Sequence, residues 1–292
     1  GWCHLTRRSI WRWHRHITIE LTGLPRFLRQ VRLDELLCIA GHEERTNGMA
    51  EKTEIAWTDS TFNPWWGCSK VGPGCDHCYA EALDRRTGGD HWGPDKTPRV
   101  MSGDNWRKPV RWQRIAEASG TRRRVFCGSM CDWADKNAPA EQRGKLWDLI
   151  RATPNLDWQL LTKRAPNIAK CLPADWSAGY ENVWLGVTVE NRKHGLPRID
   201  HLRRAPARVR FLSIEPLLED LGEIDLTGIH WVIVGGESGH GARPMEAAWV
   251  ENIKHQCEAA DVAFFFKQWG GRIDKGGCLI DGGEVKQWPR AA

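Results

Sequence analysis

Residues 209–214 read VRFLSI and residues 230–235 read HWVIVG. Both are short and nearly continuous apolar runs, which are typical of parallel β-strands that are covered on both faces. From residue 122 onward, runs of this kind alternate with amphipathic segments that favour helices. Repeated β–α units at this spacing predict a parallel sheet, either open or closed into a barrel.

The same alternation gives the expected elements. Six strands are predicted at residues 124–130, 157–162, 182–189, 209–214, 230–235 and 263–268. Helices are predicted at residues 140–152, 166–171, 191–204 and 247–260. Two weaker strand candidates, at residues 62–68 and 99–102, would raise the count to eight. We therefore predict an α/β fold, namely a parallel (β/α) barrel or partial barrel of six to eight strands.

Composition narrows the class of protein. The 292 residues are 41% hydrophobic, which suffices for a large core. Apolar runs such as 231–234 and 262–266 are far shorter than the roughly 20 residues of a membrane span, and arginines interrupt any signal-peptide core near the N-terminus. We expect a cytoplasmic protein without a membrane partner. The net charge of +5 permits contact with nucleic acid without requiring it.

The first 48 residues differ in composition from the rest. They contain eight Arg, no Lys and three Trp without a clear period, and Met49 follows. We predict that residues 1–48 are a poorly structured basic N-terminal extension, with Met49 as a natural start, and that residues 49–292 form the barrel domain. The alternative is a basic arm that binds an acidic partner.

Polar residues follow the predicted strands. In a parallel barrel these positions meet at the carboxyl-terminal rim, where active sites are built. Asn191 also has a simpler interpretation as a helix cap. The strand-end residues are Asp132, Thr162, Lys163, Arg164, Glu190, Asn191, Glu215, Glu237, Ser238, Lys267 and Gln268.

Three of the ten cysteines are clustered. Residues 63–82 read NPWWGCSKVGPGCDHCYAEA, so Cys68, Cys75 and Cys78 have the spacing C-x6-C-x2-C. The glycines and the proline of this loop favour turns, which lets three thiolates surround one centre. A helix predicted directly after Cys78 would stabilise thiolate charge with its N-terminal dipole.

The number of cysteines favours iron over zinc. A structural zinc site normally has four ligands, whereas an iron–sulfur cluster on three thiolates leaves one iron open. Zinc on the three cysteines and His77 is one alternative, and a cysteine knot without metal is another.

Several separated sequence blocks, from about residue 52 to 271, look like the family named after mycobacteriophage gene products 37 and 68. The blocks are WTDS (57–60), NPWWGC (63–68), PGCDHCYAE (73–81), LTKR (161–164), WLGVTVEN (184–191), RFLSIEPL (210–217), VIVGGESG (232–239) and FFFKQWG (264–270).

That family in turn resembles radical S-adenosylmethionine (SAM) proteins, distantly those related to spore photoproduct lyase. The resemblance implies a [4Fe–4S] cluster on Cys68, Cys75 and Cys78, with SAM as cofactor and a flavodoxin- or ferredoxin-like electron donor. The usual radical-SAM loop is C-x3-C-x2-C, whereas the first gap here is six. A Gly-Gly-Glu motif contacts SAM in such proteins, and the matching residues here are Gly235, Gly236 and Glu237. Asn191 is a further cofactor-binding candidate.

We hypothesise a radical-SAM enzyme that generates a 5′-deoxyadenosyl radical, which acts on a substrate in the barrel mouth. Phage ancestry suggests a nucleotide or nucleic-acid substrate. One alternative is a zinc-stabilised nucleic-acid-binding module without catalysis, and another is a Mg²⁺-dependent hydrolase that uses the rim carboxylates. The catalytic candidates are Asp132, Lys163, Glu190, Glu215 and Lys267. The candidates for binding a carboxylate or phosphate group are Lys163, Arg164, Arg243 and Lys267.

Overall fold

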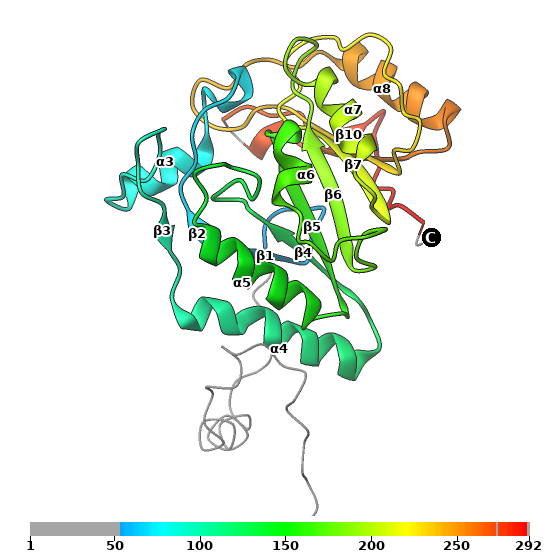
Figure 1. The fold of residues 1–292 in the computed structure, drawn as a ribbon. Helices are drawn as coiled ribbons and strands as arrows, with labels where there is room; N and C mark the ends of the chain where they lie inside the picture. Colours follow the sequence, from blue (N-terminus) through cyan, green and yellow to red (C-terminus); the bar gives the residue numbers. More distant parts are fainter. Residues whose placement is uncertain (1–52, 273, 291–292) are drawn as a thin grey trace, which may run out of the picture. The chain divides into compact units, whose positions relative to one another are not determined.

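One parallel sheet of seven strands forms the centre of the computed structural model, which describes residues 53–272 and 274–290 (Figure 1). All neighbouring strands are parallel, and they follow one another in the sheet as they do along the chain. The predicted α/β partial barrel is confirmed, whereas the extension predicted at residues 1–48 lies outside the described residues. The strands are β1 (Ser60–Phe62), β4 (Arg123–Cys127), β5 (Leu156–Thr162), β6 (Val183–Thr188), β7 (Val209–Ile214), β8 (Trp231–Gly235) and β9 (Ala263–Gln268).

Helices cover the outer face of the sheet. Alternate strand residues, such as Val125, Leu185 and Val232, point outward and share one large apolar core with residues from the helices. The helices are α3 (Tyr79–Arg86), α4 (Gly103–Ser119), α5 (Ala140–Arg151), α6 (Ile168–Cys171), α7 (Leu196–Arg204) and α8 (Ala247–Ala259). Because the helices α4 to α8 pack on this face and aromatic side chains fill the other, most strands are buried on both faces, which explains the apolar runs in the sequence.

The sheet is strongly curled, as the ring contacts of Trp57 with two distant strands demonstrate. Its ring centroid lies 4.6 Å from that of Phe126 in β4 and 6.2 Å from that of Trp231 in β8. These two strands are four positions apart in the sheet, which would be about 19 Å in a flat sheet. One indole can contact both only if the sheet curls around it. The concave face is thus filled by aromatic residues of the strands and by Trp57.

A glycine makes room for this filling. Gly186 in β6 pairs with Phe211 in β7, and a Cβ atom on Gly186 would lie 2.3 Å from the tip of the Phe211 ring. Phe211 is fully buried. The missing side chain at Gly186 therefore lets this ring lie flat across the concave face.

The C-terminal segment closes the amino-terminal end of the curled sheet. The backbone N–H of Phe266 donates to the carbonyl oxygen of Val285 at 2.8 Å, so this segment runs antiparallel along β9. Trp288 packs 5.0 Å from Trp231, and the guanidinium of Arg124 in β4 lies 3.6 Å from the Trp288 ring centre. This tail bridges β9 and β4 across the open edge of the partial barrel.

Four details differ from the prediction. The candidate strand at residues 62–68 is not one strand, because β1 of the main sheet ends at Phe62 and Trp65–Trp66 form the separate strand β2. The candidate strand at residues 99–102 forms only β3 (Arg99–Val100), which pairs with β2 in an antiparallel hairpin outside the main sheet, so the count of eight was wrong. The prediction missed α4, whose interior contains Pro109, a residue that normally disfavours helices. The third predicted helix begins later than expected because residues 191–195 form a turn before α7. A further hairpin joins β10 (Leu279–Ile280) and β11 (Gly283–Glu284).

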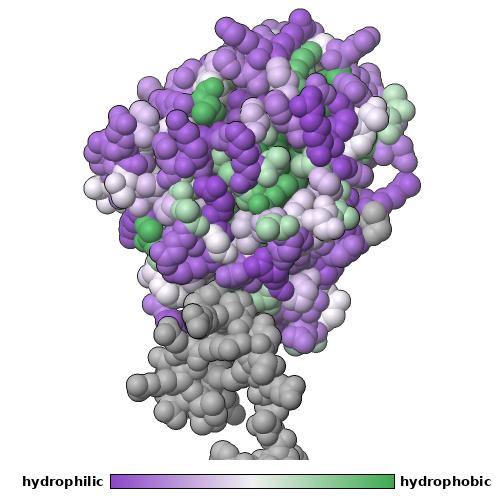
Figure 2. All heavy atoms as spheres, in the orientation of Figure 1, coloured by the Kyte–Doolittle hydropathy of each residue, from purple (hydrophilic) through white to green (hydrophobic). Residues whose placement is uncertain are grey.

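The face in Figure 2 is mostly hydrophilic, with one hydrophobic area near the centre and smaller hydrophobic spots elsewhere. Within the described part of the chain, no helix has the length and apolar character that a membrane crossing requires.

Replacing Gly186 by alanine should lower the free energy of unfolding by about 1–3 kcal/mol, because the added methyl group overlaps the Phe211 ring. Urea unfolding measures this change. Gly144→Ala in α5 is the matched control, since a Cβ there meets no atom within 4 Å and alanine favours helix. An equal effect of both substitutions on stability would contradict the proposed packing.

Candidate functional site at the carboxyl ends of the strands

The loop that contains the three cysteines, residues 67–78, lies across the carboxyl ends of the strands. A Cβ atom on Gly74 would lie 2.4 Å from Oε1 of Glu190, which follows β6. Nη2 of Arg243, in the segment after β8, donates to the carbonyl oxygen of Pro73 at 2.9 Å. The loop is therefore held between two separate strand ends.

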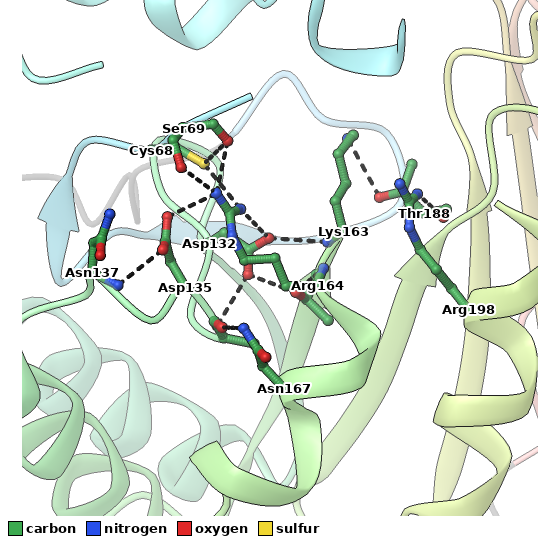
Figure 3. A network of polar contacts seen from close by, with 12 residues as sticks. Cys68, Ser69, Asp132, Asp135, Asn137, Lys163, Arg164, Asn167, Thr188 and Arg198 are labelled. Atoms are coloured by element: carbon green, nitrogen blue, oxygen red, sulfur yellow. Dashed lines mark hydrogen bonds and ion pairs between the residues drawn. The ribbon is translucent and has the colours of Figure 1, made fainter. Parts of the chain in front are cut away.

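Arg164 is the centre of a polar network below the start of this loop (Figure 3). Its Nη1 donates to Sγ of Cys68 at 3.4 Å and to Oδ2 of Asp132 at 3.0 Å. Its Nη2 donates to the carbonyl and hydroxyl oxygens of Ser69 at 2.7 and 2.8 Å, and pairs with Asp135 at 2.8 Å. With a side chain only 9% exposed, this cation links the first cysteine to two carboxylates that follow β4.

Asp132, a predicted catalytic residue, organises the turn after β5. Oδ1 accepts hydrogen bonds from the Thr162 hydroxyl at 2.6 Å and from the Ala134 N–H at 3.0 Å. Oδ2 accepts hydrogen bonds from the Lys163 N–H and from Arg164, both at 3.0 Å. Both carboxylate oxygens are thus occupied within the protein, which gives Asp132 a positioning role in this structure. Its catalytic role stays a prediction.

A second network joins the loop to the end of β8, where a bulge follows Val234. Oε2 of Glu237 accepts hydrogen bonds from the backbone N–H and Nε of Arg243, at 3.0 and 2.9 Å, and lies 2.8 Å from Nδ1 of His77. Burial raises the pKa of Glu237, but the hydrogen bonds from Arg243 and His77 outweigh it and hold the pKa at about 2. The ionised carboxylate fixes the loop at His77.

Two lysine–glutamate pairs face the concave side of the sheet below the loop. Lys163 lies two residues after Leu161, which packs in the inner aromatic cluster, so its side chain points to the same face. Its Nζ is 3.6 Å from Oε1 of Glu190. Nζ of Lys267 is 2.8 Å from Oε1 of Glu215. The strand ends therefore bring together four of the five predicted catalytic residues in two pairs.

Each glutamate has a second partner that holds it in place. Arg198 in α7 pairs with Oε2 of Glu190 and donates to the carbonyl oxygen of Thr188 at 2.6 Å. The indole N–H of Trp57 donates to Oε2 of Glu215 at 3.2 Å. Oε1 of Glu190 is buried and has no hydrogen-bond donor among the described residues. This atom is directed toward the mouth of the partial barrel, near Lys163 and the loop.

The three cysteines share this environment without forming a ready metal site. Cys68 and Cys78 pack against the same small apolar cluster, which contains Trp92 and Met130. Burial and the charge of Asp132 raise the pKa of Cys68 to about 12, although Arg164 lowers it. In the part of the chain that the structure describes, no three His, Cys, Asp or Glu side chains converge as metal ligands.

The predicted cofactor-binding residues have contacts within the protein. A Cβ on Gly235 would lie 2.8 Å from Oε1 of Glu215, and one on Gly236 would lie 1.9 Å from the carbonyl oxygen of Trp269. Both glycines therefore permit close approaches of neighbouring groups. Asn191 Oδ1 accepts a hydrogen bond from the backbone N–H of His194 at 2.8 Å and caps the turn before α7. Their contacts with a cofactor, like that of Glu237, stay predictions.

Arg198 and Asp135 were missed by the sequence reasoning. For Arg198 a signal exists, because it lies four residues before the buried Leu202 and thus on the apolar face of α7. An arginine at such a position needs a buried partner. For Asp135 no signal distinguishes it from other loop aspartates.

A family model described as "Protein of unknown function (DUF5131)" matches residues 52–289. The match includes the cysteine loop and every strand of the main sheet. The chain belongs to this family. The relation of this DUF5131 member to the family named after mycobacteriophage gene products stays a prediction. No curated protein matches the chain.

The fold of this DUF5131 member is similar to that of a solved mutant of spore photoproduct lyase with bound AdoMet and dinucleoside spore photoproduct. The TM-score is 0.42 and the sequence identity is 12%. The similarity covers 72% of this chain and 64% of that one, so the chain spans somewhat less than two thirds of the length of that protein.

Glu237→Gln should lower the free energy of unfolding near neutral pH. The difference from the wild type should become smaller as the pH falls into the acid range. The folded-state pKa of about 2 lies below the ordinary value of 4.5, so the stability that this carboxylate contributes is present above pH 4.5 and is lost as the pH falls toward 2. Urea unfolding at several pH values measures the difference from wild type. The control is Glu251→Gln, on an exposed part of α8. A difference that stays constant with pH would contradict this role of Glu237.

Proposed function

We propose that this protein is a radical-SAM enzyme with an iron–sulfur cluster on Cys68, Cys75 and Cys78. One observation carries the proposal: a three-cysteine loop is fixed over the carboxyl ends of a curled parallel sheet, directly above two partly buried lysine–glutamate pairs. In parallel α/β folds, substrates and cofactors bind at this end of the sheet.

The residues present fit such a cluster. The loop offers three thiols, the number that leaves one iron open for a further ligand. Two of them, Cys68 and Cys78, already contact one apolar cluster, which limits water near the metal. Arg164 donates an N–H group to the first sulfur. In the proposal, insertion of the cluster draws the three sulfur atoms together within this loop.

When bound, the cluster and SAM supply a one-electron cleavage that gives methionine and a 5′-deoxyadenosyl radical. The protein binds and orients the reactants. Lys163 and Lys267 bind carboxylate or phosphate groups, and Glu190 and Glu215 bind amino or hydroxyl groups. Trp57 and the aromatic residues beneath it close the floor of the site and exclude water from that side.

The two lysines at the mouth support an anionic substrate, and we propose a nucleotide or nucleic acid. A flavodoxin- or ferredoxin-like protein would provide the electron, and the enzyme would act in the cytoplasm. The pairing of each described rim carboxylate with Lys or Arg disfavours the alternative of a Mg²⁺-dependent hydrolase, whose metal needs several oxygen ligands free to converge.

The full-length chain, purified without oxygen and reconstituted with iron and sulfide, should contain about four irons and four sulfides. Its absorption spectrum should change on reduction with dithionite and again on addition of SAM. Replacing Cys68, Cys75 or Cys78 by alanine should remove most of the iron, because each substitution deletes one of three ligands.

Cys278→Ser is the matched control for these substitutions. Cys278 is also a free thiol that is not fully buried, but its Sγ contacts Glu284 at 3.3 Å in the C-terminal hairpin, outside the loop. This variant should retain the iron content of the wild type. One zinc per chain, no iron and no response to SAM would refute the enzyme and favour a zinc-stabilised nucleic-acid-binding module.

A further inference from the structure

We propose that Arg164 is a positioning residue that raises the reduction potential of the cluster through its contact with Cys68. This inference rests on the proposed function and extends it, because it assigns control of the electron-accepting step to a residue outside the three-cysteine loop.

The first support is geometric. The planar guanidinium of Arg164 binds the loop at two consecutive residues, through Nη1 to Sγ of Cys68 and through Nη2 to both oxygens of Ser69. Arg164 is itself fixed from behind by the carboxylates of Asp132 and Asp135. Because the buried guanidinium is bound by the loop on one side and by the two carboxylates on the other, it sets the position of the Cys68 sulfur relative to the strand ends.

The second support is electrostatic. Reduction adds one negative charge to a cluster, and both an N–H donor to a ligand sulfur and a nearby positive charge stabilise the reduced form. Arg164 provides both from a position with little solvent. Without it, Asp132 and Asp135 would face the Cys68 sulfur as uncompensated negative charges, which would disfavour the added electron.

A second contact between an arginine and a cysteine sulfur, that of Arg143 with Cys171, provides a control. Nη1 of Arg143 lies 3.0 Å from Sγ of Cys171, which is outside the cysteine loop. Nη2 of Arg143 donates to the carbonyl oxygens of Asp135 and Ala138, so this arginine supports the same β4–α5 connection from another side. Its loss should loosen that connection and leave the charge beside Cys68 unchanged.

The experiment measures midpoint potentials by titration with dithionite, which donates one electron to the cluster, in the reconstituted full-length chain. In Arg164→Gln, the ratio of reduced to oxidised cluster at a fixed solution potential should fall about tenfold, which corresponds to a shift of about 59 mV toward negative values. Arg164→Lys, which keeps the charge, should restore part of this shift. Arg143→Gln should leave the potential unchanged.

Asp135→Asn provides a test of opposite sign. It removes a negative charge from the network and should shift the potential toward positive values, which a general loss of packing would not do. If Arg164→Gln does not fold, Asp135→Asn by itself tests the inference about Arg164.

The outcomes separate the two proposals. A wild-type chain that takes up no iron and sulfide overturns both. A wild-type cluster whose potential is the same in Arg164→Gln, or is shifted equally by Arg143→Gln, overturns the inference about Arg164 and leaves the proposed function standing. If Arg164→Gln does not fold, an unchanged or more negative potential in Asp135→Asn likewise overturns the inference about Arg164 and leaves the proposed function standing.

Discussion

The packing of Trp57 inside the curled sheet is the contact on which the rest of the structure depends. Because the helices α4 to α8 pack on the outer face, the concave face has to be filled by side chains of the strands and of the segment before β1. Trp57 contacts Phe126, Phe211 and Trp231, which come from strands far apart in the sheet. Its indole N–H donates to Glu215, where the aromatic filling ends and the polar mouth begins. The same residue thus packs inside the curled sheet and contacts the polar residues at its carboxyl end.

The mouth combines two kinds of cation. The arginines are held by several acceptors: Arg164 and Arg243 each bind the cysteine loop and a carboxylate that follows a strand. The lysines have fewer contacts, and Nζ of Lys163 and of Lys267 each lie near one glutamate on the concave side. A guanidinium suits a fixed network because it donates in several directions from one plane, whereas an ammonium on a flexible stem can change partners when a ligand enters. The arginines therefore hold the rim together, and the two lysines are the cations with the fewer contacts there.

Burying so many charges is costly unless each has a partner. In this protein the partners of the buried arginines come from segments distant in sequence. The ion pairs that neutralise these arginines therefore also fix the position of the cysteine loop. The Arg164 network joins residues 68–69, 132–135 and 164, and the Glu237 network joins residues 73–77 with 237–243. Three separate strand ends and the cysteine loop are held together by these contacts, so the site acquires its geometry only when the whole sheet has formed.

The sequence by itself determined the sheet, most of its strands and helices, and the gathering of polar residues at the strand ends. It could do so because strands buried on both faces leave long apolar runs, and because residues after parallel strands must meet at one edge. Only the tertiary structure decided that β3 stays outside the barrel, that Pro109 lies within a helix, and that Asp132, Glu237 and Asn191 bind the protein's own groups. It also decided that Arg164 contacts Cys68. The reason is physical: a local pattern records whether a side chain is buried, whereas the choice of partner for a buried charge depends on segments that folding brings together from far apart.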